Sequence, residues 1–365
     1  MINPGRLDRG YEKYASEYEE KALEVLRSGW YVLGKEVEAF EKEFASYIGS
    51  RYSAGVANGL DALSLAFRAL GIGEGDEVIV QANTYIASVM GITMNGATPV
   101  FVEPDEYFGI DPKEVEAAVT ERTKAVLAVH LYGLSCDMEK ITGICKKHGL
   151  KLVEDCAQSH GSKFNGQMTG TFADIGCFSF YPSKNLGCFG DGGAVVTDNE
   201  EYLKKIKMLR NYGSAKRYYN DEVGVNSRLD ELQAGLLRVK LGHLDELNEE
   251  RDRIAKAYLE GIKNPAVTLP RIREGCNHTW HQFVIRCGTR DELMEYLKKK
   301  EIGTIIHYPV PPHLQKAYGC LNKKKGDFPI SEAMADEVLS LPMYNGMTGE
   351  EIKTVIDAIN SFKGA

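Results

Sequence analysis

The chain has 365 residues, which is enough for one large domain and a smaller one with a substantial core. Hydrophobic residues make up 43% and charged residues 26%, as in an ordinary globular protein. The formal net charge of -8 argues against a general role in binding nucleic acids or membrane surfaces. The eight cysteines form no C-x-x-C pair and have no metal-type spacing. With no signal peptide and no long apolar run, we expect reduced thiols, no metal site and a cytoplasmic location.

Helical and strand patterns alternate along the first two thirds of the chain. Helical patterns are found at 1–27, 37–48, 63–70 and 203–209. Short apolar runs predict buried strands at 78–80, 99–102, 125–129, 152–153 and 175–180. Strands that are separated by helical patterns predict a mostly parallel sheet with crossover helices.

A long polar helical pattern from 244 to 259 separates this part from a C-terminal region of mixed helices and strands. We therefore predict an α/β fold, with a large domain at 1–245 that includes the N-terminal helical segment. A smaller α+β domain is predicted at 246–365. Ligand sites in parallel sheets lie beyond the carboxyl ends of the strands, and the chemically informative residues of this chain fall there.

One of these residues is Lys184. The apolar run at 175–180 stops at Pro182, and Lys184 follows before a cluster of glycines. The aromatic residues expected around it are Phe178, Phe180, Tyr181 and Phe189. A partly desolvated amine has a lowered pKa and attacks carbonyl groups more readily. A lone lysine, however, more often packs its aliphatic part and extends its amine to the surface, so the interpretation needs further residues.

Asp155 and Gln158 follow the strand at 152–153. A carboxylate at a strand end is usually an ordinary loop residue. Pyridoxal 5'-phosphate (PLP), however, requires of a protein a lysine that joins it covalently and an acid that pairs with its protonated ring nitrogen. Lys184 and Asp155 form such a pair. Gln158 is in the same turn and is suited to donate to the phenolic oxygen of the ring.

The residues before the helix at 63–70 are suited to bind a phosphate group. Asn58 is a good N-cap for this helix, and Gly59 allows close approach of a ligand to the backbone. The first amides of the helix, those of Gly59 and Leu60, therefore form a site suited to an anion such as a cofactor phosphate. A well-capped surface helix is the alternative explanation.

Four ordered motifs together resemble the signature set of the DegT/StrS family. They lie at 58–63 (Asn-Gly-Leu-Asp-Ala-Leu), 154–158 (Glu-Asp-Cys-Ala-Gln), 178–185 and 190–194 (Gly-Asp-Gly-Gly-Ala). The family consists of PLP-dependent nucleotide-sugar aminotransferases of fold type I, and the resemblance covers nearly the whole chain. It implies that Lys184 carries the cofactor and that Asp155 binds its ring nitrogen. Leu60 departs from the threonine of many relatives, so no hydroxyl is supplied there.

The resemblance implies further cofactor contacts. Ser179 would help to bind the phosphate, and Tyr85 would stack on the pyridine face. Residues 224–228 resemble a Gly-x-Asn-x-Arg segment in which the asparagine, here Asn226, reaches the cofactor of the neighbouring subunit. This implies a homodimer with the active site at the subunit interface. A helix N-cap is the alternative role for Asn226.

Candidates for contacts with the nucleotide sugar are less specific. Tyr31 is in the N-terminal region that borders the substrate site in the family, and His307 and Tyr308 are in a segment that lines the entrance. Tyr181, next to the lysine, and His160 complete the set. For His160 a hydrogen-bonded wall residue or a group behind the cofactor is the alternative.

The resulting prediction is an aminotransferase that moves an amino group, most simply from L-glutamate, to the keto carbon of a nucleotide-linked deoxysugar. Retention of Lys184, where sugar dehydratases of the family carry histidine, favours transamination. The motif variants resemble members that act on dTDP-3-keto-6-deoxyhexoses. A 4-keto nucleotide sugar, or another PLP reaction of fold type I, remains an alternative. A non-catalytic sensor of the sugar nucleotide is the alternative from a different class of protein.

Overall fold

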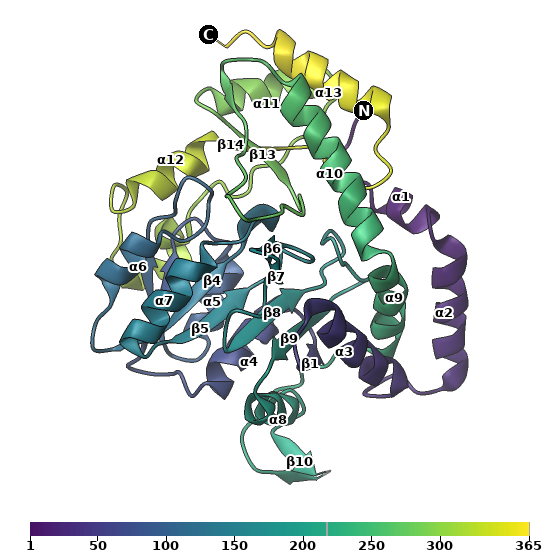
Figure 1. Ribbon diagram of the computed structural model, residues 1–365, viewed down its shortest axis with the longest axis vertical. Helices are drawn as coiled ribbons and strands as arrows, with labels where there is room; N and C mark the ends of the chain where they lie inside the picture. The colour runs from purple at the N-terminus through teal and green to yellow at the C-terminus, as the bar shows by residue number, and fades with distance from the viewer. Residues whose placement is uncertain (217, 365) are drawn as a thin grey trace.

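A seven-stranded sheet forms the centre of the molecule (Figure 1). The computed structural model describes residues 1–216 and 218–364. Within these residues the strand order is β1-β9-β8-β5-β4-β2-β3, and only β9 runs against the other six. The strands are β1 (Tyr52–Val56), β2 (Glu77–Gln81), β3 (Thr98–Val102), β4 (Thr123–Val129), β5 (Lys151–Asp155), β8 (Ile175–Ser179) and β9 (Gly193–Thr197). The predicted parallel sheet is confirmed.

Helices cover both faces of this sheet, because alternate side chains of each buried strand point to opposite faces. Along β2, Val78 and Val80 belong to one hydrophobic cluster and Ile79 to another. The first face is covered by α4 (Gly59–Ala69), α5 (Ile86–Thr93) and α8 (Glu200–Leu209). The second is covered by α6 (Pro112–Ala118), α7 (Met138–His148), α3 (Lys35–Ile48) and α9 (Glu231–Gly242).

Packing between α3 and β8 fixes the strand that leads to Lys184. Phe44 of α3 meets Phe178 and Phe180 edge-on, with ring centroids 5.0 and 5.3 Å apart. Phe40 stacks on Phe44 at 5.5 Å. All four rings are fully buried, and such aromatic pairs contribute about 0.5–1.5 kcal/mol each beyond their buried area. The end of β8 is therefore held rigidly.

The C-terminal part has its own sheet and core, drawn at the top of Figure 1. Its strand order is β12-β13-β14. Its elements are α10 (Leu244–Gly261), β12 (Val267–Thr268), β13 (Phe283–Cys287), α11 (Arg290–Lys299), α12 (Pro329–Glu337), β14 (Val338–Leu341) and α13 (Gly349–Ser361). The predicted boundary between 245 and 246 falls within the first turn of α10. That boundary stays a prediction. Ile2 pairs with Ile302, so the N-terminus of the chain also packs against the C-terminal core.

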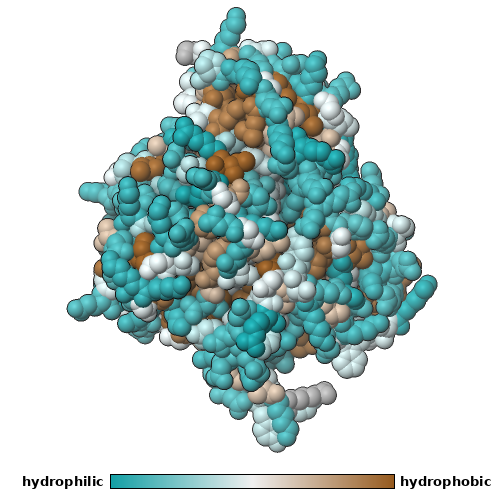
Figure 2. Space-filling view, in the orientation of Figure 1, coloured by the Kyte–Doolittle hydropathy of each residue, from teal (hydrophilic) through white to brown (hydrophobic). Residues whose placement is uncertain are grey.

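The N-terminal segment forms two helices rather than one, α1 (Leu7–Glu12) and α2 (Ala15–Ser28). Shorter elements complete the chain: β6 (Lys163–Phe164) pairs with β7 (Gln167–Met168), and β10 (Ser214–Lys216) with β11 (Tyr219–Asn220). Hydrophilic residues cover most of the face in Figure 2, and hydrophobic residues reach it in separate patches, most clearly near the top, over the C-terminal part. Among the helices of the described residues, none combines the length and the apolar character needed to cross a bilayer.

Candidate active site

Lys184 lies in the connection that leaves the carboxyl end of β8. Its backbone amide donates to the carbonyl of Tyr181 at 2.8 Å, which closes a tight turn. Burial lowers the pKa of the Lys184 amine to about 8, and the opposing effect of the Asp155 charge is smaller. Within the described residues, no hydrogen bond or ion pair engages the amine. A larger fraction of the Lys184 amine is therefore unprotonated near neutral pH than in an exposed lysine, and it is available for reaction.

The carboxylate of Asp155 is buried and held in a fixed orientation at the end of β5. Its Oδ2 accepts a hydrogen bond from Ser88 Oγ at 2.8 Å, and its Oδ1 accepts one from the Ala157 amide at 3.1 Å. Ser88 is positioned by α5, and its hydroxyl also meets Thr84 Oγ1 at 2.7 Å. A buried carboxylate with two donors and no cationic partner within the described residues is suited to pair with a protonated ring nitrogen.

Gln158, Tyr308 and Tyr85 form a connected group beside Asp155. The Gln158 side chain accepts from the Tyr132 amide at 2.6 Å and donates to the Tyr308 hydroxyl at 3.1 Å. The Tyr308 ring lies 4.9 Å from that of Tyr85. Burial raises the pKa of Tyr308, so this phenol stays protonated. Tyr85 precedes α5 and is half exposed, which leaves its ring free to stack on a planar ligand.

The start of α4 meets the end of β8 at very short range. Asn58 caps the helix by accepting from the Asp61 amide at 2.9 Å, while the amides of Gly59 and Leu60 have no partner in the described part of the chain. A Cβ at Gly59 would come within 2.6 Å of the Ser179 Cβ, so only glycine fits here. The two free amides at this helix end therefore form, with the adjacent Ser179 side chain, a site for a phosphate group.

These residues fit PLP. The free amides and Ser179 suit its phosphate, Asp155 its ring nitrogen, Tyr85 its ring face and Lys184 its aldehyde. Asp155 and Ser179 end their strands, and the others follow a strand or begin the helix after one, where ligand sites of such sheets are found. Gln158 retains one amide proton for the phenolic oxygen.

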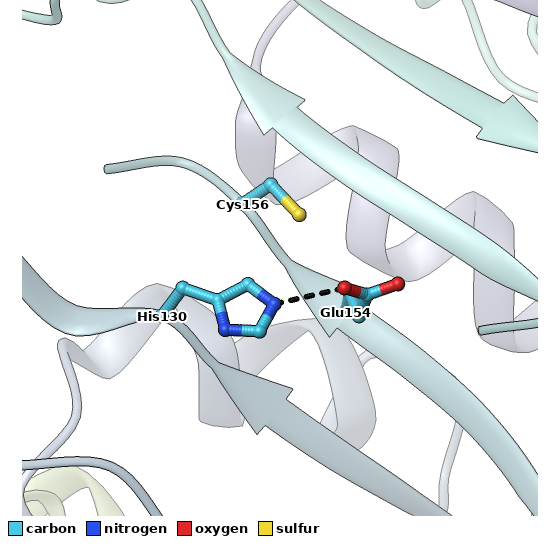
Figure 3. Close-up of side chains that lie close together, drawn as sticks. All are labelled: His130, Glu154 and Cys156. Carbon is cyan, nitrogen blue, oxygen red and sulfur yellow. Dashed lines mark hydrogen bonds and ion pairs between the residues drawn. The ribbon is translucent and has the colours of Figure 1, made fainter. Parts of the chain in front are cut away.

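Behind Asp155, Glu154 points to the opposite side of β5 and meets His130 and Cys156 (Figure 3). The His130 Nδ1 accepts from the Cys136 amide at 3.1 Å, so Nε2 carries the proton and donates to Glu154 at 2.9 Å. Glu154 also accepts from the amides of residues 170, 172 and 173. The donor atoms of the three side chains lie within 4.8 Å of one another, yet the imidazole and the carboxylate already have partners. We interpret the group as a structural anchor.

His307 and Tyr181 lie near Lys184, and their contact with the substrate stays a prediction. His307 Nδ1 is 2.7 Å from Ser340 Oγ, and Nε2 is 3.0 Å from Gln282 Nε2. Burial, and then the charge of Lys184, lower the pKa of His307 to about 4. The Tyr181 side chain is half exposed.

Three predicted residues lie elsewhere. His160 is fully buried beside Phe178 and Phe180, with centroids 5.5 and 5.8 Å away, so the predicted substrate contact is corrected to a position beneath the site. Burial lowers its pKa to about 3. Tyr31 is exposed and donates to the Leu26 carbonyl. Asn226 is exposed and its backbone pairs with Asn211.

Two residues of the site carried no predicted role. Ser88 orients Asp155, and Asn185 fixes the turn after Lys184. The buried Asn185 amide donates to the Thr279 carbonyl at 2.7 Å and to Asn248 Oδ1 at 2.8 Å. Ser88 lies three residues after Tyr85 and Asn185 directly after Lys184, so proximity to the motifs was the available signal.

Comparison with known proteins agrees with this geometry. The profile of the DegT/DnrJ/EryC1/StrS aminotransferase family matches residues 12–360. The dTDP-3-amino-3,6-dideoxy-alpha-D-galactopyranose transaminase of Aneurinibacillus thermoaerophilus is 53% identical over 96% of both chains. The dTDP-3-amino-3,4,6-trideoxy-alpha-D-glucose transaminase of Streptomyces venezuelae is 46% identical over 98% of this chain and 94% of that one. A third relative, 45% identical over 97% and 98% of the two chains, is the erythromycin biosynthesis sensory transduction protein EryC1 of Saccharopolyspora erythraea.

Solved structures give the same result. S. venezuelae DesV in complex with a ketimine intermediate has a TM-score of 0.97 at 46% identity, over 98% of this chain and 97% of that one. NtdA from Bacillus subtilis with bound cofactor PMP has a TM-score of 0.90 at 32% identity, over 97% and 83%. The PLP form of the sugar aminotransferase Spr1654 from Streptococcus pneumoniae has a TM-score of 0.90 at 26% identity, over 95% of both.

Proposed function

The chain belongs to the DegT/DnrJ/EryC1/StrS aminotransferase family, and from this premise we propose that it aminates the 3-keto carbon of a dTDP-linked 6-deoxyhexose, with L-glutamate as the donor. It is a PLP-dependent sugar aminotransferase of fold type I. The product of the proposed reaction is a dTDP-3-amino-3,6-dideoxyhexose.

The observation that carries catalysis is the pair formed by Lys184 and Asp155. Lys184 has an amine whose pKa is lowered to about 8, and Asp155 is a buried carboxylate fixed by Ser88. When bound, PLP supplies an aldehyde that accepts the amino group and a ring that withdraws electrons from the neighbouring C–H bond. Lys184 provides the reactive amine, and Asp155 provides the carboxylate that pairs with the ring nitrogen.

The roles of the chain's own residues follow from their environments. The buried Asp155 carboxylate would pair with the ring nitrogen, and an opposite charge there favours the protonated nitrogen. The Lys184 amine is suited to hold and move a proton beside the cofactor, since its pKa of about 8 is near the working pH. Gln158 and Tyr308 fix the ring orientation through their mutual hydrogen bond. Gly59, Leu60 and Ser179 hold the phosphate.

The choice of sugar is supported by the relatives. The transaminases of A. thermoaerophilus and S. venezuelae are both named for dTDP-linked sugars with an amine at carbon 3. They differ in the deoxygenation of carbon 4, and identity is higher to the enzyme whose sugar keeps that oxygen. His307, Tyr181 and Tyr308 are proposed to contact the sugar, and Tyr31 the nucleotide.

We further propose a cytoplasmic homodimer in which Asn226 reaches the phosphate of the partner's cofactor. Its exposed side chain supports this, because an exposed residue is free to meet a second copy. The neighbouring Ser227 accepts from the Ala57 amide at 3.1 Å, so the segment lies beside the loop that precedes the phosphate site.

A sensor that binds the sugar nucleotide without turnover is the second candidate, because one relative at 45% identity is named a sensory transduction protein. Such a role needs no reactive lysine. The intact set of Lys184, Asp155 and the phosphate site favours turnover.

The decisive experiment supplies purified holoenzyme with L-glutamate and a panel of 3-keto and 4-keto nucleotide sugars, linked to dTDP or UDP. We expect amination of the dTDP-3-keto-6-deoxyhexose, identified by mass and by NMR of the amine-bearing carbon. Amination at carbon 4, or only of UDP sugars, would contradict the proposed substrate. No amination of any sugar would favour the sensor.

A further inference from the structure

A cavity of about 420 Å³ lies beside Lys184, between the N-terminal segment, α9, α10 and the C-terminal part. Lys184 and His307 line it, whereas Asp155, Gly59 and Ser179 do not. It is therefore distinct from the cofactor contacts and shares with them the reactive lysine. Its volume is in the range of small-molecule sites.

The charged residues that line this cavity are all basic. Its described lining includes Arg6, Lys184, Lys240 and Arg251, and neither aspartate nor glutamate, although the chain as a whole has a net charge of -8. Arg6 is already paired with Asp8 at 2.5 Å. Lys240 and Arg251 have no acidic partner within 4.0 Å in the described part of the chain.

Lys240 and Arg251 both retain donors that the protein does not use. Lys240 is half-buried on α9, and its amine donates to the Gly187 carbonyl at 3.2 Å, which leaves two of its three protons. Arg251 on α10 is 7% exposed. Its Nη1 donates to the carbonyls of Trp280 at 3.0 Å and His281 at 3.2 Å, and more weakly to that of Met343 at 3.5 Å.

Arg251 has two further donor groups, Nε and Nη2. Its Nε donates to Asn345 Oδ1 at 3.2 Å, and no partner in the described chain engages Nη2.

The charged forms of Lys240 and Arg251 are destabilised when no anion is bound. Burial, and to a smaller extent the positive charge of Arg251, lower the pKa of Lys240 to about 8. Burial also lowers the pKa of Arg251 to about 10. A bound anion would offset this cost, since buried charges are stable when paired and hydrogen-bonded.

We propose that this cavity binds a carboxylate of the amino donor, with Lys240 and Arg251 as the residues that recognise it. The inference rests on the proposed function. A donor must bring its amine to the cofactor held by Lys184, and a cationic cavity lined by the same lysine can hold its carboxylate within reach. The diphosphate of the nucleotide is the other anion that the reaction offers, and the experiment separates the two.

The test uses holoenzyme with two probes, glutarate, which has the carboxylates and lacks the amine, and dTDP, which has the diphosphate and lacks the sugar. Binding is measured by calorimetry for the wild type, Lys240→Met and Arg251→Lys. Lys256→Met is the control, because Lys256 lies on α10, is exposed and pairs with Asp252. Thermal unfolding and cofactor absorbance establish that each variant is folded and loaded.

We expect Lys240→Met to weaken glutarate binding by about 10-fold or more, the effect of losing a charge-assisted hydrogen bond, with dTDP binding unchanged. Arg251→Lys, which keeps the charge and loses the planar fork, weakens glutarate in the same way. The L-glutamate concentration for half-maximal conversion of the cofactor rises in parallel.

Weakened dTDP binding, or unchanged glutarate binding in both folded variants, overturns the proposal. If wild-type holoenzyme fails to convert its cofactor with L-glutamate, the proposed donor reaction is wrong. The glutarate titration still decides whether the cavity binds carboxylates.

Discussion

The chemistry of Lys184 depends on a balance between burial and charge. Burial lowers the pKa of its amine and the carboxylate of Asp155 raises it, and burial has the larger effect. A lowering from 10.5 to about 8 increases the free amine at pH 7 by about 300-fold. The protein thus makes the amine reactive by its position in the fold rather than by a neighbouring base.

This balance predicts the pH dependence of cofactor capture. Apoenzyme mixed with PLP should bind it covalently at a rate that rises with pH, with a midpoint near pH 8, because only the free amine attacks. Stopped-flow absorbance measures this rate, and Lys184→Arg, which keeps the charge but cannot react, is the control. A midpoint near 10.5, the value of an ordinary lysine, would contradict the structural environment.

Asp155 and its hydrogen-bond donor Ser88 provide a second test. We expect Asp155→Asn to reduce turnover by about 10²-fold or more, since it removes a buried charge aimed at the reacting system. Ser88→Ala should cost about 10-fold, the value of one hydrogen bond to a charged group, and shift the cofactor absorbance. Ser361→Ala, an exposed serine on α13, is the control. Normal turnover in Ser88→Ala would mean that the carboxylate is oriented by other contacts.

At the scale of elements, the contact between α4 and β8 controls the phosphate site. Gly59→Ala forces the helix start away from Ser179, because the new Cβ would lie 2.6 Å from the Ser179 Cβ. We expect a loss of about 1–3 kcal/mol in stability, together with weaker PLP binding in a fluorescence titration. Gly143→Ala on α7, where a Cβ meets nothing within 4 Å, should instead stabilise the protein by about 0.5–1 kcal/mol. Equal PLP affinity in both variants would disprove the predicted role of Gly59.

Elements with a strong local pattern were the ones that could be predicted from sequence. Strands β2, β4 and β8 are continuous apolar runs, and α3 shows a clear amphipathic spacing. Strand β1 (Tyr52–Val56) contains serine and glycine, and its conformation depends on pairing with β9, about 140 residues away in the chain, so no local signal marks it. The short β6 and β7 pair locally with each other, but strands of two residues are too short to show an alternating pattern.

Within the site, local motifs identified the residues but not their partners. Lys184, Asp155 and Gln158 each lie in a recognisable segment. The bond from Ser88 to Asp155 joins residues 67 positions apart, and the burial of His160 depends on rings of β8. Such contacts follow from the assembled sheet, and no alternation or spacing in the sequence shows them.

At the scale of the whole molecule, the proposed sharing of the active site predicts complementation. Lys184→Ala and Asn226→Ala should each be inactive alone, because each damages both sites of a homodimer. Unfolding and refolding the two together should recover part of the activity, since a mixed dimer has one site with both residues intact. Sedimentation establishes the dimer. No recovery from a mixture that forms dimers would mean that Asn226 serves its own subunit or neither.

The alternation of side chains along β5 decides which of two neighbouring acids faces Lys184. Neighbours 154 and 155 are both acids, one tied to His130 and three amides, the other facing the lysine. A slip of this strand by a single position would exchange the tied acid for the reactive one. The hydrogen bonds of Glu154 therefore fix the register of β5. They set the position of the Asp155 carboxylate, although Glu154 itself does not contact a substrate.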